Sequence, residues 1–358
     1  MHAGGASNFF MSCSYRLERC LELSIALGIS ATVTSCTWMF ISSFEGLRNR
    51  LVHECNIDSL VHTQGPNNHP DVFDANAIML LRHKHLDDYE GSFFKLDKLG
   101  LSVKKEMLRE AIANPDCGYF YRRNAKTFTQ IPGTPIAYWA SEGLLFAFSS
   151  CVKLKDICPP RVGLQTSDNA RFLRLWFECQ YSKIAYCCKS ADESMSNSKK
   201  WYPHNKGGSF RRWYGNSEYV IDYESNGLNL RSSENASVIP DRIVFRRCIT
   251  YSRITSGAIS FRVQPTGYLF DSAAVSIFPS KQIDYMLGLL NSSVIANATS
   301  FLVPTLNAQP GDIAKLPIAL PENLKTIAAS FVVQCESIAK LDWDSFETSW
   351  DFKRHPLL

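Results

Sequence analysis

The sequence lacks paired cysteines. It has 12 cysteines in 358 residues, but none forms a Cys-Xaa-Xaa-Cys pair and only Cys187 and Cys188 are adjacent. Structural zinc sites and the disulfide frameworks of secreted proteins both need regularly spaced cysteines. We therefore expect reduced thiols in a cytoplasmic protein, with neither a metal site nor a disulfide framework.

The sequence also lacks an unbroken hydrophobic run long enough to cross a membrane. Its most apolar stretch, Leu21–Ile41, is interrupted by Gly28 and by several serines and threonines. A membrane-spanning helix needs about 20 predominantly apolar residues. We expect instead a helix over Tyr15–Leu27 and then a buried strand of a parallel sheet over Ala31–Phe40. The predicted protein is soluble and has no membrane partner.

Neither sign of charge dominates the chain, whose formal net charge is +4. Residues 151–250 carry 16 Lys and Arg against 10 Asp and Glu. Residues 1–150 carry 14 against 15, and residues 251–358 carry 8 against 9. The positive excess therefore lies in the middle hundred residues. Electrostatic steering by the whole protein should be weak, and any site for a polyanion should be local.

The basic region contains the stretch KKWYPHNKGGSFRRWYGN. Cations neutralise phosphates, aromatic rings stack on bases, and paired glycines let the main chain approach a ligand closely. This composition predicts a nucleic-acid contact, although a solvated basic face with a few core aromatic residues would have the same composition. The candidate DNA-binding residues here are Lys199, Lys200, Lys206, Gly207, Gly208, Arg211, Arg212 and Asn216.

A second candidate stretch, GLQTSDNARFLRLWFE, precedes the first along the chain. Gln165, Thr166 and Asn169 carry the amide and hydroxyl groups that read adenine edges and bind phosphate. The same stretch fits the start of a helix, with Ser167 or Asp168 as its cap. The two interpretations are compatible, because a helix N-terminus itself favours phosphate.

Two arginines follow this predicted cap. Arg171 and Arg174 are three residues apart and would share one face of the helix. Pairing with an acid such as Glu178 competes there with contact to phosphate. We count both arginines among the candidate DNA-binding residues.

The pattern of predicted elements changes near residue 150. Before it, the apolar runs IDSLVHTQ and NAIMLLRHKH read as strands, and GLRNRLVHE reads as a helix capped by Ser42. After it, short runs such as DRIVFRRCITYSRI, AISFRV and GYLFDSAAVSIFPS read as strands separated by turns. Further helices are expected over Lys104–Ala113 and over QIDYMLGLLNSSVIANATSFL.

The predicted fold class is therefore α/β plus α+β. We expect four parts along the chain. They are the terminal elements of an α/β domain (1–85), a polar connecting region (86–150), a β-rich domain (151–320) and a C-terminal docking segment (321–358).

Seven segments spread over most of the chain carry a family resemblance. They are TWMFISSFEGLRNRL, PGTPIAYWAS, GLQTSDNARFLRLW, KWYPHNKGGSFRRWYGN, YLFDSAAVSIFPS, LLNSSVIANATSFLVPTLNAQPGDIAKLPI and DWDSFETSWDF. In this order they resemble the PglX-like adenine-specific DNA methyltransferases of BREX phage-defence systems. The resemblance implies a partial Rossmann-like methyltransferase sheet followed by a β-rich target-recognition domain. It also implies double-stranded DNA as a partner and S-adenosylmethionine as the family's cofactor.

One of these segments has a wider resemblance. The pattern LNSSVIA, LVPTLN and DIAKLPI is similar to the end of target-recognition domains in type I restriction specificity subunits and TaqI-like methyltransferases. In those domains an asparagine-serine helix start and a short strand pack the recognition lobe. The resemblance implies that Ile313, Leu316 and Ile318 belong to the core.

The motifs that carry methyl transfer are missing from the sequence. Transfer to an adenine amino group needs a glycine-rich cofactor loop and an Asn/Asp-Pro-Pro-Tyr/Phe loop that holds the flipped base. The only Pro-Pro pair, Pro159-Pro160, is flanked by Cys158 and Arg161. We therefore expect no catalytic residue in this chain and no cofactor bound by the chain alone.

Two functions remain open at this point. In the first, the chain is the C-terminal, DNA-recognition portion of a site-specific adenine-N6 DNA methyltransferase of a phage-defence system, and a companion methyltransferase chain supplies the catalysis. In the alternative, it is a non-enzymatic docking module. Its aromatic basic loop and the DWDSFETSWDF segment would then bind other defence-system proteins and not DNA.

Overall fold

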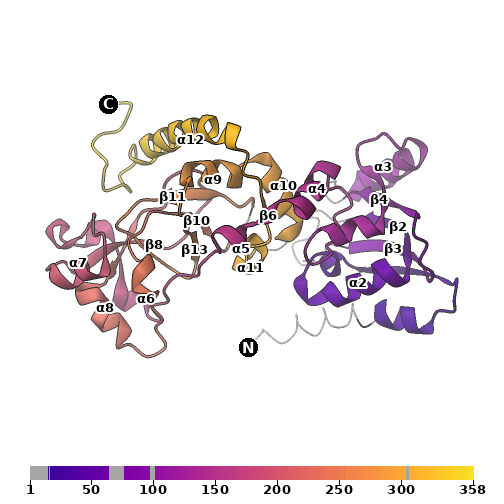
Figure 1. The fold of residues 1–358 in the computed structure, drawn as a ribbon, viewed down its shortest axis with the longest axis horizontal. Helices are drawn as coiled ribbons and strands as arrows, with labels where there is room; N and C mark the ends of the chain where they lie inside the picture. The colour runs from indigo at the N-terminus through magenta and orange to yellow at the C-terminus, as the bar shows by residue number, and fades with distance from the viewer. Residues whose placement is uncertain (1–14, 16, 64–75, 97–100, 256, 304–305) are drawn as a thin grey trace. The chain divides into compact units, whose positions relative to one another are not determined.

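The chain folds into two compact units, Met1–Ser150 (unit 1) and Cys151–Leu358 (unit 2) (Figure 1). The computed structural model describes residues 15, 17–63, 76–96, 101–255, 257–303 and 306–358. Helices and β-strands occur in both units, which confirms a mixed α/β fold. Within the described residues, no helix combines the length and the apolar character that crossing a membrane requires.

Unit 1 is built on a five-stranded sheet with the strand order β1-β3-β2-β4-β5. Its strands are β1 (Ile29–Ser35), β2 (Asn56–His62), β3 (Asn76–Arg82), β4 (Glu90–Lys95) and β5 (Phe120–Asn124). β3 pairs antiparallel with both β1 and β2, β2 pairs in parallel with β4, and β4 pairs antiparallel with β5. The sheet is therefore mixed.

Helices and short 3-10 turns accompany this sheet. They are η1 (Cys36–Met39), η2 (Ser42–Phe44), α2 (Glu45–Glu54), α3 (Leu101–Ala113), η3 (Ala125–Gln130) and α4 (Glu142–Ser150). Trp38, Leu51 and Phe93 lie in the core between α2 and the sheet. Arg48 is fully buried and donates to the carbonyl oxygens of Trp38 and Gly133, at 2.8 and 2.6 Å. The hydrogen bonds of Arg48 therefore link α2 to η1, which precedes it, and to the turn at Gly133, which follows η3.

Unit 1 departs from the sequence prediction at its first strand. β1 ends at Ser35 and pairs antiparallel, so the prediction of a buried strand in a parallel sheet over Ala31–Phe40 is wrong. The side chains of Ile29 and Val33 are 54% and 69% exposed. Apolar composition alone cannot distinguish a buried central strand from an edge strand with an open face.

Three other boundaries in unit 1 also differ from the prediction. The helix expected over Tyr15–Leu27 ends at residue 23. Ser42 begins η2 and does not cap α2, whose first turn has no side-chain cap. Two sheet strands, β4 and β5, lie in the segment expected to be a polar connection, while the helix expected over Lys104–Ala113 is present as α3.

Unit 2 contains three small sheets. Their strands are β6 (Val152–Lys153), β7 (Leu173–Leu175), β8 (Trp201–Asn205), β9 (Tyr219–Asp222), β10 (Cys248–Ser252), β11 (Phe261–Gln264), β12 (Leu269–Phe270), β13 (Ala274–Ile277) and β14 (Pro317–Ile318). The strand orders are β12-β8-β9-β7, β11-β10-β13 and β14-β6. The core of the four-stranded sheet includes Tyr202, Tyr223 and Phe245. The β-rich character expected after residue 150 is present.

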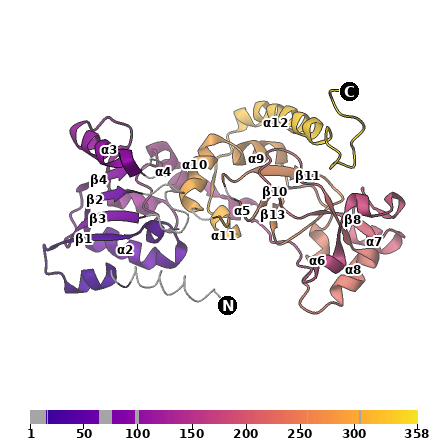
Figure 2. The same ribbon diagram turned by 180° about the vertical axis from the view of Figure 1, so that it is seen from behind.

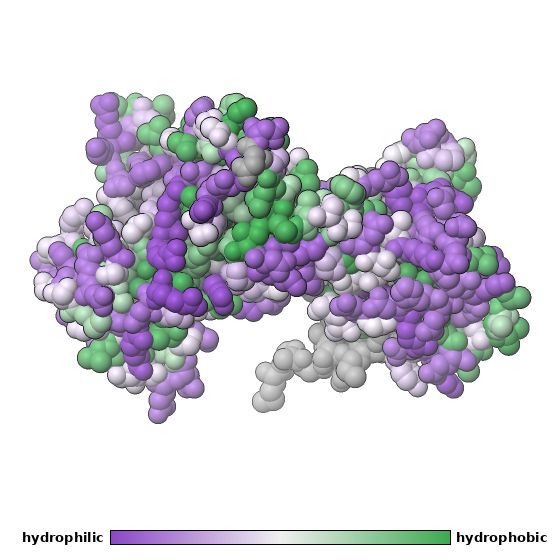
Figure 3. Space-filling view, in the orientation of Figure 1, coloured by the Kyte–Doolittle hydropathy of each residue, from purple (hydrophilic) through white to green (hydrophobic). Residues whose placement is uncertain are grey.

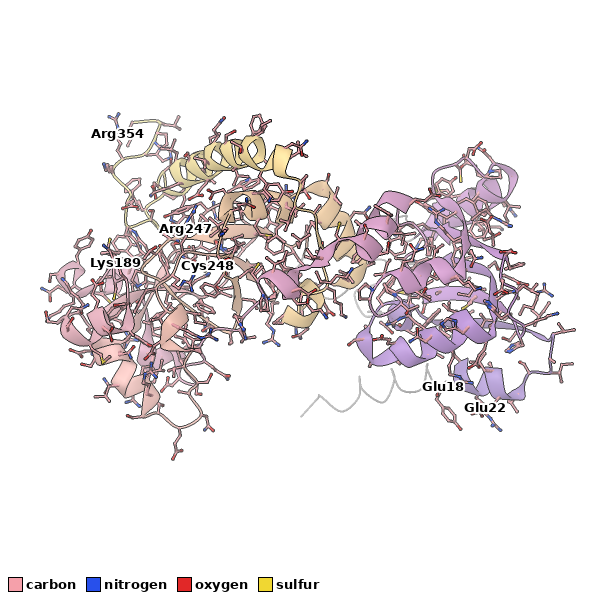
Figure 4. The ribbon with its side chains drawn as sticks, in the orientation of Figure 1. Glu18, Glu22, Lys189, Arg247, Cys248 and Arg354 are labelled. Atoms are coloured by element: carbon pink, nitrogen blue, oxygen red, sulfur yellow. The ribbon has the colours of Figure 1, made fainter. Side chains whose placement is uncertain are left out.

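The helices of unit 2 are mostly short. They are α5 (Leu154–Ile157), α6 (Asn169–Phe172), α7 (Ala191–Ser196), α8 (Glu224–Arg231), α9 (Ile283–Leu290), α10 (Ser293–Leu302), α11 (Pro310–Ile313) and α12 (Glu322–Trp343), with 3-10 turns η4 (Trp176–Glu178), η5 (Tyr181–Lys183) and η6 (Asp241–Ile243). α12 lies along α9 in both ribbon views (Figures 1 and 2). Arg247, next to Cys248 at the start of β10, ties these helices to the sheet, because it contacts Asp284 at 2.9 Å and Glu336 at 3.1 Å (Figure 4).

The end of the β-rich part matches its prediction. Ser292 caps α10 by accepting from the backbone N–H of Ile295, as the asparagine-serine pattern implied. Ile313, Leu316 and Ile318 are buried to within 1% of full burial, which confirms them as core residues. The single helix expected before them is two helices, α9 and α10, with a break at this cap.

One face of unit 2 also exposes hydrophobic surface. On the side shown in Figure 3, hydrophobic residues gather over β6 and the neighbouring helices. Val152 in β6 and Val294 in α10 are 50% and 54% exposed. The polar and basic residues predicted to bind DNA lie on other segments of this unit.

Candidate nucleic-acid interface

A small polar pocket in unit 2 brings four of the candidate DNA-binding residues together. It has a volume of about 260 Å³, and its walls are Gln165, Thr166, Ser167, Asn169, Lys206, Asp271 and Ser272. They come from three segments: the chain before α6, the end of β8 and the turn after β12. Backbone hydrogen bonds join these segments, from Leu164 to Phe270 and from Asp271 to Asn205, each at 2.9 Å. We call this site the polar pocket.

The wall of the polar pocket before α6 is fixed by its own side chains. Asp168 caps α6 by accepting from the backbone N–H of Arg171 at 3.0 Å. The hydroxyl of Thr166 donates to Oδ1 of Asn169 at 2.6 Å. The residues that cap α6 therefore also form this wall of the polar pocket.

The opposite wall is a charge cluster around Asp271. Its carboxylate accepts from Nζ of Lys206 at 2.7 Å, from Nε2 of His204 at 3.5 Å and from the backbone N–H of Ala273 at 2.8 Å. Burial alone would raise the pKa of Asp271, but the hydrogen bonds from His204 and Lys206 outweigh it and hold this pKa well below its usual range. Asp271 is therefore ionised, and it forms an ion pair with Lys206.

His204 behind this carboxylate is neutral. Burial is the main cause that lowers its pKa, and it outweighs the opposite effect of Asp271. The contact between the two residues is therefore a long hydrogen bond and not an ion pair. Nδ1 of His204 is buried and has no partner among the described residues.

The polar pocket presents amides more than charge. The side chain of Gln165 has no hydrogen-bond partner in the described part of the chain, and that of Asn169 uses only Oδ1, towards Thr166 and Lys206. The amide groups left over can donate to and accept from a base edge. The described residues include no group of three His, Cys, Asp or Glu side chains that could hold a metal ion.

The two glycines after Lys206 are required by the backbone. Gly207 and Gly208 have φ values of +88° and +115°, a region that side chains disfavour. A Cβ on Gly207 would lie 2.9 Å from the carbonyl oxygen of Ala273, and one on Gly208 would lie 2.9 Å from Nδ2 of Asn216. Asn216 is itself buried and donates to the carbonyl oxygen of Ser209 at 2.8 Å. These three candidates shape the loop from within.

A buried arginine supports this glycine turn by hydrogen bonds. Arg262 in β11 is fully buried and donates to the carbonyl oxygen of Gly207 at 3.1 Å and to Oδ1 of Asn205 at 3.4 Å. Burial lowers the pKa of Arg262 to about 10, so the guanidinium remains charged at neutral pH. Ser252 completes the support by donating to the carbonyl oxygen of Gly208 at 2.8 Å.

The arginines at the end of the loop differ from each other. Arg211 contacts Oδ2 of Asp342 at 3.3 Å and lies over the ring of Trp343, with 4.9 Å between its guanidinium carbon and the ring centroid. Arg212 is exposed. Among the described residues, its side chain contacts only the ring of Phe210, whose centroid lies 5.7 Å from the guanidinium carbon. Arg212 is therefore the freer of the two cations.

The DWDSFETSWDF segment packs on the same unit. Trp343 is 3% exposed, and the ring of Trp350 lies 5.1 Å from that of Tyr186 and 5.7 Å from that of Tyr268. The indole N–H of Trp176 donates to the carbonyl oxygen of Thr348 at 2.9 Å. This segment, which we call the tail, therefore docks within unit 2, where it packs against Trp176, Tyr186 and Tyr268.

The remaining candidates lie outside the polar pocket. Arg171 and Arg174 do not share a helix face, because α6 ends at Phe172 and Arg174 belongs to β7. Arg174 donates to the carbonyl oxygens of Ala170 and Leu173, and no contact joins it to Glu178. Lys199 donates to the carbonyl oxygen of Ser182 at 2.5 Å, and Lys200 lies 3.5 Å from Asp222. The prediction of a helix over ARFLRLWFE is therefore wrong.

Sequence reasoning missed the residues that support the candidates. Asp271, Arg262 and Asp342 lie 65, 55 and 131 positions from their partners Lys206, Gly207 and Arg211. No local sequence pattern predicts partners at such distances along the chain. An arginine within the strand-like run AISFRV was the one available signal, since a charged residue in a buried strand needs hydrogen-bond partners.

Curated proteins share sequence with almost the whole chain. It is 34% identical over 355 residues, 96% of its length, to the adenine-specific methyltransferase PglX of Lacticaseibacillus casei. It is 31% identical over 340 residues, 92% of its length, to the adenine-specific methyltransferase BrxX of Escherichia coli. By sequence, the chain is homologous to a part of the PglX-like adenine-specific methyltransferases. It spans 29% and 26% of the length of these two relatives. No protein-family model matches it.

A solved structure shares the fold of this PglX-like chain. The Type IIL restriction-modification enzyme MmeI, in complex with DNA, matches 94% of the chain and 44% of its own chain, with a TM-score of 0.50 and 12% sequence identity. A likeness at this identity concerns the fold alone. It agrees with the mixed α/β architecture described above.

Proposed function

We propose that this chain is the DNA-recognition portion of a site-specific adenine-N6 DNA methyltransferase of a BREX phage-defence system. The observation that supports it most is the polar pocket, because four residues chosen for their ability to contact DNA converge there from two separate segments. The relatives, which are adenine-specific methyltransferases, supply the chemistry of the whole protein.

In this proposal unit 2 reads DNA through its amides. Gln165 projects a free amide that matches the donor and acceptor pattern of an adenine edge in the major groove, and Asn169 adds its free donor, Nδ2. Thr166 and Lys206 hold Asn169 in place, so the reading group is preorganised. Arg212 and the lysines at the start of the loop add contacts to phosphate that carry no sequence information.

In the same proposal unit 1 is part of a Rossmann-like methyltransferase sheet. No strand pairs with the outer edge of β1 in the described part of the chain, and the apolar side chains of Ile29 and Val33 are exposed. An open edge with exposed apolar residues is the place where a sheet continues. A companion segment would add strands there, and it would bring the cofactor loop and the base-holding loop that bind S-adenosylmethionine and the target adenine.

Sequence preference tests the assignment of the polar pocket. A preferred site is first obtained by selecting duplexes bound by the parent chain from a randomised pool. Gln165→Ala together with Asn169→Ala should lower affinity for that site by about 1–3 kcal/mol and leave affinity for random duplex nearly unchanged. Gln180→Ala together with Asn297→Ala removes two exposed amides elsewhere in unit 2 and should change neither affinity.

The result has two clear readings. Equal losses on preferred and random DNA would mean that the two residues contact only the backbone. Unchanged binding to both, in a variant that unfolds at the same temperature as the parent, would show that the pocket does not contact DNA and that the proposal is wrong for this site.

A further inference from the structure

A second pocket in unit 2 is lined by three arginines and apolar walls. Its volume is about 530 Å³. Arg161, Arg242 and Arg246 lie around it, and Ile157, Ile243 and Phe278 are among its apolar residues. We call it the arginine pocket. It also includes Pro159 and Pro160, the pair whose flanking residues do not match the base-holding motif of adenine methyltransferases.

The arginines of this pocket are free of acidic partners. None of the three forms an ion pair with a carboxylate in the described part of the chain. Asp241, the acid next to Arg242 in the sequence, is already occupied, because it contacts Arg231 at 2.7 Å and Asn226 at 3.4 Å. Three like charges around one pocket repel each other, so an anion that enters gains contact with all of them.

The backbone presents these arginines from fixed positions. Arg161 exchanges two hydrogen bonds with Ser276, at 2.7 and 2.9 Å. Arg246 follows Phe245, whose side chain is fully buried and whose backbone bonds to Tyr268 and Gly267 at 3.1 and 2.9 Å. A site whose backbone is ordered before binding loses less entropy when a ligand enters.

The two chemistries of the pocket match the two parts of a nucleotide. Guanidinium groups bind phosphate oxygens in pairs, while proline, isoleucine and phenylalanine side chains accommodate a flat base. A bare phosphate would leave most of a 530 Å³ space unfilled. We propose that the arginine pocket binds a nucleotide, with its phosphate on Arg161, Arg242 and Arg246 and its base against the apolar walls. The nucleotide is either a free one or a unit of a DNA strand.

Calorimetric titration with adenosine monophosphate tests this directly. The chain should bind adenosine monophosphate, and it should bind adenosine or inorganic phosphate at least about tenfold more weakly, since each supplies only half of the contacts. Arg242→Ala together with Arg246→Ala should weaken binding of adenosine monophosphate by about tenfold or more. Lys183→Ala together with Lys189→Ala removes the same charge from exposed positions outside the pocket and should have no effect.

A second variant separates the apolar contribution from the charge. Ile157 is 39% exposed, so Ile157→Ala should fold normally. It should weaken binding of adenosine monophosphate and leave the weaker binding of inorganic phosphate unchanged. If phosphate alone binds the parent as tightly as adenosine monophosphate does, the apolar walls do not hold a base and the proposal is wrong.

Binding of a short oligonucleotide distinguishes the two sources. If the nucleotide belongs to DNA, the double arginine variant should bind the oligonucleotide more weakly than the lysine control, and adenosine monophosphate should compete with it. If the nucleotide is free, oligonucleotide binding should be equal in both variants while binding of adenosine monophosphate is lost. Equal binding of both probes by the two variants would overturn the proposal. None of these outcomes depends on Gln165 or Asn169, so this test can fail or succeed independently of the DNA-recognition test.

Discussion

The polar pocket and the loop end at Phe210–Arg212 contain similar residue types in different surroundings. In the pocket, Asp271 and His204 stand behind the polar groups and leave the amides of Gln165 and Asn169 facing the opening. At the loop end, Asp342 of the tail forms an ion pair with Arg211. Whether a cation or an amide is available to a ligand therefore depends on the residues that contact it. Those residues come from remote parts of the chain.

The largest expected effect concerns the support beneath the glycine turn. Arg262→Met keeps most of the side-chain volume but removes the donors to Gly207 and Asn205, which leaves the buried carbonyl oxygen of Gly207 unpaired, while Oδ1 of Asn205 keeps only the backbone N–H of Gly207. We expect a loss of about 3 kcal/mol in the free energy of unfolding, measured by urea denaturation. On the DNA-recognition proposal, DNA affinity should fall as well, because the turn beside Lys206 loses its support.

An exposed position in the adjacent turn provides the control. Thr266→Ala lies next to β11 and changes no hydrogen bond made by a described residue, so stability should stay within about 0.5 kcal/mol of the parent. A loss below about 1 kcal/mol for Arg262→Met would mean that the turn is held by its glycines and Ser252 alone.

Acid should weaken the charge cluster behind the pocket. Burial lowers the pKa of His204, so below about pH 6.5 the unfolded chain binds a proton that the folded protein does not. The unfolded state then gains protons, and stability falls as pH decreases from 7.5 to 5. The pKa of Asp271 is also lowered, but its contribution is lost only below about pH 4.

Unfolding measurements at pH 5, 6 and 7.5 check this direction. His204→Asn removes the titrating group, so the variant should lose less stability over this range than the parent does. Identical losses in both proteins would show that His204 gains its proton in the folded state too, and the picture of a neutral imidazole behind Asp271 would have to be abandoned.

The smallest effect on stability is expected at the tail. The pair between Arg211 and Asp342 is partly exposed on both sides, so Asp342→Ala should cost less than about 1 kcal/mol. The change frees Arg211, and on the DNA-recognition proposal it should raise affinity for duplex DNA and steepen its salt dependence by about 0.9 per added phosphate contact.

Another acid of the tail gives a control of equal charge. Glu347 is exposed and has no ion-pair partner among the described residues, so Glu347→Ala alters net charge without releasing an arginine. Equal gains in affinity for the two variants would mean that overall charge, and not the contact with Arg211, limits binding.

The sequence indicated local structure well and distant partnerships poorly. The run IDSLVHTQ is a strand as far as His62, NAIMLLRHKH is a strand as far as Arg82, and GLRNRLVHE is a helix, because their apolar spacing reflects burial on one face. The prediction of one helix over ARFLRLWFE was wrong, because its apolar residues lie first in a single helical turn and then in a strand. The polar pocket could be predicted from the segment before α6 and from Lys206, but not on the side of Asp271, because nothing in the residues around this aspartate indicates that it pairs with Lys206.

On the DNA-recognition proposal, the separation between the reading groups and their supports has a consequence for how target preference can change. Gln165 lies in a short segment before α6, while Asp271, His204 and Arg262 keep the surrounding backbone in place from other strands. Exchange of one or two side chains in that segment leaves every supporting hydrogen bond of the glycine turn intact. A protein arranged in this way can acquire a new target by grafting a few residues, without rebuilding the fold that carries them.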